Sequence, residues 1–197
     1  MVAHTLGAEG NEPGKTIKLY FYPAFTDVRL ELNCAESIEG TVRLQSCELS
    51  SMDTPLSAKF SAQIRTYGES EGNGIEFTPI ENISYTVFMD CTDEIPDGII
   101  INRVGSESVS VDIICLPFET TENIKLTCNF TIGTEKYYSK SIEIPGYLFK
   151  PRRQNRLKGL VLPGENGEPE IDAKFIVETM GQVIGGTIGS DDWSQNW

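Results

Sequence analysis

The sequence predicts an all-β protein, an antiparallel β-sandwich of roughly 7–10 strands. Apolar and polar residues alternate through much of residues 16–163, which is typical of strands with one face in a core and the other in water. Turn-rich segments separate these strands, and no segment before Pro163 has a sustained helical apolar period. Because strands do not alternate with helices, we expect two packed sheets that each bury one face.

The clearest predicted strand is 26–32, with the sequence TDVRLEL. Val28, Leu30 and Leu32 fall on one face, and charged residues fall on the other. The same pattern predicts strands at 40–44, 58–66, 84–89, 108–116, 124–132 and 136–144. Segments 69–74 and 93–98 are expected to be turns, and residues 133–134 are expected to link a β-hairpin.

The composition of the chain divides it into three parts. Residues 1–15 are polar and glycine-rich and are expected to be a flexible leader, 16–163 form the sandwich, and 164–197 form a C-terminal extension. Within this extension, 171–178 is strand-like, and 181–189 (GQVIGGTIG) has a weakly specified register that could pair with more than one partner.

Five of the 16 basic residues gather in 148–163, LFKPRRQNRLKGLVLP, although the formal net charge of the chain is -13. These residues are Lys150, Arg152, Arg153, Arg156 and Lys158. A phosphate or nucleic-acid site is one interpretation, but the acidic background disfavours a nucleic-acid binder. The other interpretation is a strand ending at 149, a polar turn and a strand at 157–162. We favour this closing hairpin, with the basic side chains along a sheet edge where they discourage unwanted pairing.

The sequence offers little that points to catalysis, metals or cofactors. The single histidine, His4, lies in the leader, and the five cysteines have neither a CxxC pair nor a neighbouring histidine. We expect these cysteines to be small buried hydrophobes, with one disulfide possible in principle. No window is long enough in apolar residues to cross a bilayer, and the N-terminus lacks signal-peptide features. The chain is therefore cytosolic, or its targeting segment lies outside this sequence.

Three segments resemble the fimbrillin-like proteins of the Bacteroidales, which are subunits of surface pili. Residues 19–32 (LYFYPAFTDVRLEL) are similar to an alternating strand that follows an aromatic–proline start. Residues 38–60 resemble the pairing of a short core strand with a later small–Lys–Phe strand. Residues 116–163 are similar to a Leu–Pro hairpin followed by the hairpin that closes a fimbrillin domain. They differ from it in having Arg152–Arg153 where a glycine–lysine pair is usual.

This resemblance implies a transthyretin-like sandwich, exported as a lipoprotein to the outer membrane and cell surface. It implies a non-enzymatic structural or adhesive subunit of a fimbria, which assembles with identical or homologous subunits by β-strand exchange. The donor strand would come from 171–197, and the interface candidates are Phe175, Val177, Val183, Ile184, Ile188, Trp193 and Trp197. The alternative is that this tail packs on its own domain as a last strand, with Trp193 covering the core.

Two other classes of function remain open at this stage. One is a carbohydrate- or protein-binding surface module, with a host glycan or protein as its partner. Its stacking platform would be Tyr137, Tyr138 and Tyr147, or else Trp193 and Trp197. The other is an enzyme with two carboxylates converging in a cleft at about 5–9.5 Å. Because acidic residues fall mostly on polar strand faces and in loops, we do not expect an enzyme.

Overall fold

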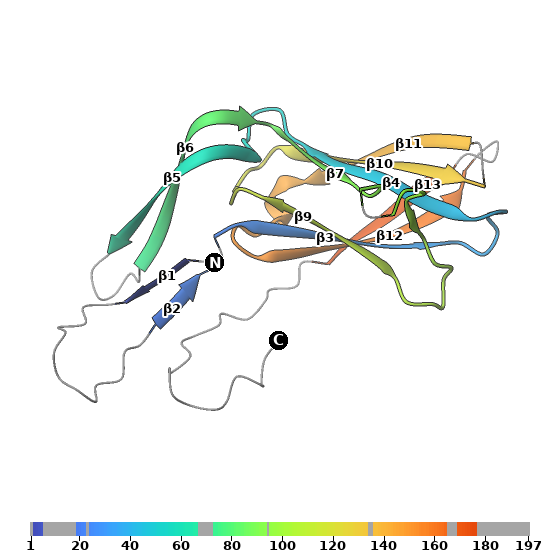
Figure 1. Ribbon diagram of the computed structural model, residues 1–197, viewed down its shortest axis with the longest axis horizontal. Coiled ribbons are helices and arrows are strands. Elements are labelled where there is room, and N and C mark those ends of the chain that lie inside the picture. Colours follow the sequence, from blue (N-terminus) through green and yellow to red (C-terminus); the bar gives the residue numbers. More distant parts are fainter. Residues whose placement is uncertain are drawn as a thin grey trace, which may run out of the picture.

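The computed structural model describes residues 2–5, 19–22, 24–66, 73–93, 95–133, 136–164 and 169–176, and Figure 1 shows their arrangement. In this part of the chain, the elements in order are β1 (Val2–Thr5), β2 (Leu19–Tyr22), β3 (Thr26–Cys34), β4 (Val42–Ser50), β5 (Ser57–Thr66), β6 (Asn73–Ser84), β7 (Thr86–Asp90), β8 (Ile99–Ile100), β9 (Val109–Cys115), β10 (Asn123–Ile132), β11 (Lys136–Pro145), the 3-10 helix η1 (Gly146–Leu148), β12 (Gln154–Pro163) and β13 (Pro169–Ile176).

Two facing sheets form a β-sandwich, which confirms the predicted fold class. One is four-stranded with the order β13-β12-β3-β9, and the other is five-stranded with the order β11-β10-β4-β7 and β8 beside β4. Antiparallel pairing prevails, but β12 runs parallel to β3. This parallel pair departs from the purely antiparallel sheets expected from the sequence.

The apolar residues on one face of each strand form the core of the sandwich. In β3, buried and half-buried residues alternate along the whole strand, so Val28, Leu30 and Leu32 face the opposite sheet. In β10, the inward stripe ends at Phe130, which is completely buried. The core contributed by the two sheets comprises Val28, Leu30, Leu32, Cys34, Val42, Leu44, Cys47, Leu49, Val111, Ile113, Cys115, Ile124, Leu126, Cys128, Phe130, Ile144, Leu157 and Val161.

The β10–β11 hairpin is also confirmed, with Ile132 opposite Lys136. The link between the two strands therefore comprises residues 133–135, one residue more than predicted. Gly133 begins this link at a φ of +66°, which is the left-handed region that glycine enters without a steric penalty.

Two ribbons lie outside the sandwich. β5 and β6 pair only with each other, as do β1 and β2. Figure 1 shows the β5–β6 ribbon extending from one end of the sandwich and curving downward in this view, with the β1–β2 ribbon below it. The sequence analysis predicted β5 but not β6, and it placed β1 within the leader.

The closing hairpin predicted for 148–163 is wrong. β11 belongs to the five-stranded sheet and β12 to the four-stranded sheet, so the segment between them crosses from one layer to the other. Here β12 lies between β13 and β3, so its basic residues are not on a sheet edge. A run of apolar residues on either side of a polar turn has the same appearance in a hairpin and in a crossover, because alternation does not identify the neighbouring strand.

The crossover begins with a close backbone contact at Gly146. Its amide donates to the carbonyl of Glu122 at 2.9 Å. A Cβ at this position would lie 2.3 Å from that carbonyl oxygen and 2.6 Å from Cγ2 of Thr120.

We therefore predict that Gly146→Ala destabilises the protein by about 3 kcal/mol, because backbone has to move to admit the methyl group. Urea unfolding followed by circular dichroism measures this free energy. Gly133→Ala is the control, because no atom lies within 4 Å of its added Cβ. This variant should lose only about 1 kcal/mol of stability, from the strain of alanine in the left-handed region. Equal losses for the two variants would contradict the packing argument.

Candidate functional site

The edge of the four-stranded sheet formed by β12 and β13 is the candidate site for strand exchange. β13 pairs antiparallel with β12 from Pro169 opposite Pro163 to Ile176 opposite Arg156. Its other side has no strand partner in the described part of the chain, so β13 is held in the sheet through a single ladder. Such a strand is the easiest one in a sheet to remove or replace.

β12 has a glycine, Gly159, at the point where β13 packs against the core. Gly159 faces inward, and a Cβ there would lie 2.7 Å from Cδ2 of Leu32 and 3.5 Å from Cγ2 of Ile171. Ile171 of β13 packs against the core at this point. Because Gly159 has no side chain, Leu32 and Ile171 fill the space that a larger residue would occupy.

Two buried polar side chains fix the crossover that precedes β12. Thr26 Oγ1 accepts the backbone N–H of Arg152 at 2.9 Å, where Arg152 has a φ of +57°. Asn155, almost fully buried, accepts the N–H of Lys150 at 2.7 Å and donates to the carbonyls of Lys150 and Arg153 at 3.1 and 3.3 Å. These bonds satisfy backbone groups that would otherwise be unpaired inside the protein.

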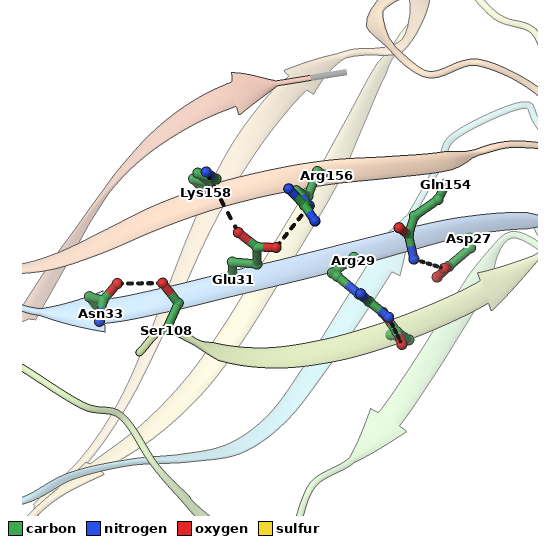
Figure 2. A network of polar contacts seen from close by, with 9 residues as sticks. Asp27, Arg29, Glu31, Asn33, Ser108, Gln154, Arg156 and Lys158 are labelled. Carbon is green, nitrogen blue, oxygen red and sulfur yellow. Dashed lines mark hydrogen bonds and ion pairs between the residues drawn. The ribbon is translucent and has the colours of Figure 1, made fainter. Parts of the chain in front are cut away.

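Figure 2 shows that the basic residues of β12 meet an acidic residue of β3 on the outer face of this sheet. Arg156 Nε lies 2.9 Å from Glu31 Oε1, and Lys158 Nζ lies 3.9 Å from Glu31 Oε2. The parallel register places Lys158 opposite Glu31 and Arg156 opposite Arg29, two residues earlier on the same face. These two of the five basic residues are thus neutralised within the sheet, whereas Lys150, Arg152 and Arg153 belong to the crossover.

A second pair of charges joins β3 to β9 on the same face. The guanidinium of Arg29 donates to both carboxylate oxygens of Asp112, at 2.7 and 2.8 Å. This bidentate bond raises the pKa of Arg29 above its ordinary value, so the guanidinium stays charged.

Asp27 is the least well satisfied carboxylate of the face. Its Oδ2 accepts from Gln154 Nε2 at 2.7 Å, but its buried Oδ1 has no hydrogen-bond partner among the described residues. Burial raises the pKa of Asp27 above its ordinary value of 3.8, and the bond from Gln154 opposes that rise.

The structure describes only part of the predicted donor segment. Phe175 lies in β13, opposite Leu157 of β12, so this end of the segment pairs within its own domain. Val177, Val183, Ile184, Ile188, Trp193 and Trp197 lie outside the described residues. The sequence analysis did not identify Thr26, Asn155 or Gly159, because an isolated polar residue or glycine in a strand gives no periodic signal.

All five cysteines are buried and have free thiols. Cys128 of β10 lies directly opposite Cys47 of β4, and contact with Cys128 raises the pKa of Cys47 well above its ordinary value of 9.0. Burial raises the pKa of Cys115 to about 12. Cys47 and Cys115 are therefore un-ionised at neutral pH, and all five cysteines are small buried side chains.

The described ranges contain neither a metal-binding cluster nor a membrane-spanning helix. No group of three or more His, Cys, Asp or Glu side chains there is placed to hold a metal ion. No helix among those residues has the length and apolar character of a transmembrane span.

Its two facing sheets define this chain as a β-sandwich module. No protein-family model and no curated protein matches its sequence. Its fold is similar to that of a solved "putative cell adhesion protein" from Bacteroides fragilis, with a TM-score of 0.50 and 12% identity over 85% of this chain and 49% of that one. The chain thus spans about half the length of that protein, and at this identity the similarity concerns the fold alone.

Two further solved structures carry the same description. One is from Bacteroides ovatus, with a TM-score of 0.41 and 11% identity over 90% of this chain and 61% of that chain. The other is from Bacteroides uniformis, with a TM-score of 0.35 and 11% identity over 89% and 65% of the respective chains. At these TM-scores, the two do not add to the fold assignment.

Asp27 gives a testable pH dependence. Its pKa is raised in the folded protein, so ionisation costs folding free energy as the pH rises from the ordinary value through the raised one. Asp27→Asn should therefore be more stable relative to the wild type at pH 7 than at pH 3. The gain should be below about 1 kcal/mol, since the group is only half buried and solvent screens it.

Urea unfolding at the two pH values measures this difference. Gln154→Ala removes the bond that lowers the pKa, so it should enlarge the advantage of Asp27→Asn at pH 7. A constant difference between Asp27→Asn and wild type across this range would show that the carboxylate is not destabilised by burial.

Proposed function

We propose that this chain is a domain of a bacterial cell-surface adhesion protein, exported and anchored as a lipoprotein at the outer membrane. More specifically, we propose a non-enzymatic subunit of a fimbria that joins other subunits, of its own kind or homologous, by exchanging β13. The observation that carries this proposal is the position of β13, which occupies a sheet edge and, among the described strands, is paired with β12 alone.

The contacts that hold β13 do not depend on which chain supplies it. The ladder from 163 to 156 offers main-chain hydrogen bonds over the full length of β13, and the space beside Gly159 accepts one apolar side chain. A strand from another copy would form the same bonds, so exchange costs little once β13 has separated. In isolation, β13 closes its own domain; in an assembly, it would close the next one.

The solved structure from Bacteroides fragilis supports an adhesive surface role by its name as well as its fold. Because the chain covers 49% of that protein, the proposal concerns one domain and not the activity of a whole subunit. The resemblance of 19–32, 38–60 and 116–163 to fimbrillin-like proteins supports the narrower fimbrial role.

Two carboxylates on the outer face of the four-stranded sheet support a non-enzymatic role for that face. Asp112 is bound by Arg29, and Glu31 lies between Arg156 and Lys158. Groups committed to ion pairs in this way are poor candidates for a general acid or base, because a catalytic carboxyl has to reach the substrate.

Intermolecular cross-linking tests the exchange. Lys158 of β12 lies opposite Lys174 of β13, so Lys158→Cys in one copy and Lys174→Cys in another place two thiols face to face only when β13 has moved between copies. Co-expressed in the bacterial envelope, the two full-length variants should form a disulfide-linked dimer on non-reducing gels. The native cysteines are all buried and should not interfere.

Two controls give this test its meaning. A single chain carrying both substitutions should form the bond internally, which establishes that the two positions can react. Lys158→Cys combined with Glu170→Cys should give no dimer, because Glu170 lies opposite Leu162. If the internal bond forms but no dimer appears between copies, β13 is a permanent strand of its own domain and the fimbrial proposal fails.

A further inference from the structure

A surface depression of about 430 Å³ lies where the loop after β9 meets the crossover after β11. Its volume is in the range of small-molecule sites. It is lined by Glu119, Thr120, Thr121, Tyr147, Phe149, Lys150 and Pro151. The described residues of β13 do not contribute to this lining.

The walls of the depression are held in place by the fold. Phe149 is buried at its base, and its ring lies 5.3 Å from the ring of Phe118. The amide of Phe149 donates to the carbonyl of Gly146 at 3.0 Å, and the amide of Gly146 donates to the backbone carbonyl of Glu122. The backbone around the depression is therefore preformed, so a ligand would have to order only the exposed side chains at its rim.

Two glutamates in the same loop have different roles. Glu122 accepts hydrogen bonds from the hydroxyl of Ser51 and from the backbone N–H groups of Asp53 and Thr54, at 3.2 and 3.0 Å for the latter two. The bond from Ser51 is the main reason that the pKa of Glu122 is lowered. The carboxylate of Glu122 therefore holds the loop in place, and both of its oxygens accept hydrogen bonds within the protein.

Glu119, by contrast, is not committed to the fold. Within the described part of the chain, the side chains of Glu119, Thr121, Tyr147 and Lys150 have no hydrogen-bond or ion-pair partner. Glu119, Thr121 and Lys150 are exposed, and Tyr147 is 63% exposed. An acceptor, a hydroxyl, a cationic donor and an aromatic ring thus surround one hollow without binding one another.

We propose that this depression binds the pyranose ring of a neutral glycan. The apolar face of a sugar ring would stack on Tyr147, and its hydroxyls would donate to Glu119 and accept from Lys150 and Thr121. The negative charge of Glu119 and the positive charge of Lys150 cancel, and the chain as a whole carries a net charge of -13. An anionic ligand would therefore gain little electrostatic attraction at this site. The mixture of polar groups also disfavours a purely apolar peptide.

This inference is independent of strand exchange, since the depression is complete without β13. A chain that binds sugar without exchanging β13, or one that exchanges it without binding sugar, would separate the two proposals.

Saturation-transfer NMR on the full-length chain tests the site directly. The probes are the methyl pyranosides of glucose, galactose, mannose and N-acetylglucosamine at about 10 mM, a concentration suited to millimolar affinities. We expect at least one of them to give a transfer signal. Tyr147→Ala should weaken its affinity about five-fold or more, whereas Tyr147→Phe should retain most of it because the stacking face remains.

Tyr137→Ala is the matched control. Tyr137 is 62% exposed, nearly the same as Tyr147, but it lies on β11 and does not line the depression. Its replacement should leave binding unchanged. The proposal is overturned if no pyranoside gives a signal, if Tyr147→Ala binds as well as wild type, or if N-acetylneuraminic acid binds more tightly than every neutral sugar.

Discussion

The rest of the structure depends on the parallel pairing of β12 with β3. β11 lies in the five-stranded sheet, so the chain has to cross to the four-stranded sheet before β12 can pair in parallel with β3. That crossing needs a sharp corner, which Thr26 and Asn155 provide with their hydrogen bonds to the backbone around Arg152. Once β12 is in place beside β3, its second edge is open, and β13 occupies it.

The same constraint accounts for both proposed binding properties. Because β13 is the last described strand and is hydrogen-bonded on one side only, it can leave the sheet without removing a strand beyond it. Because the crossover has to pass the loop after β9, the two segments meet and enclose the depression beside Tyr147. The proposed strand-exchange edge and the proposed ligand-binding depression therefore both result from the crossover between β11 and β12, although they lie at different places.

The sequence predicted most strands but not how they are connected. Alternation located β3, β9, β10 and β11 to within two residues, because each of them buries one face in the sandwich. It missed β6, which pairs with β5 outside the sandwich and contains Pro79, and it assigned β12 to a hairpin with the wrong neighbour. Alternation reports which face a residue occupies and contains no information about pairing partners. The pattern did not predict the structural roles of Asn155 and Glu122 for a related reason, since both roles depend on contacts with residues distant in sequence.

The central claim is that β3 and β12 form a permanent frame and that β13 is the replaceable strand. Native-state hydrogen exchange, resolved by residue, measures this most directly. The account predicts that amides of β13 bonded to β12 exchange at least about ten-fold faster than those shared by β3 and β12, through local opening without global unfolding. Equal protection across the three strands, with all of them exchanging only through global unfolding, would contradict it.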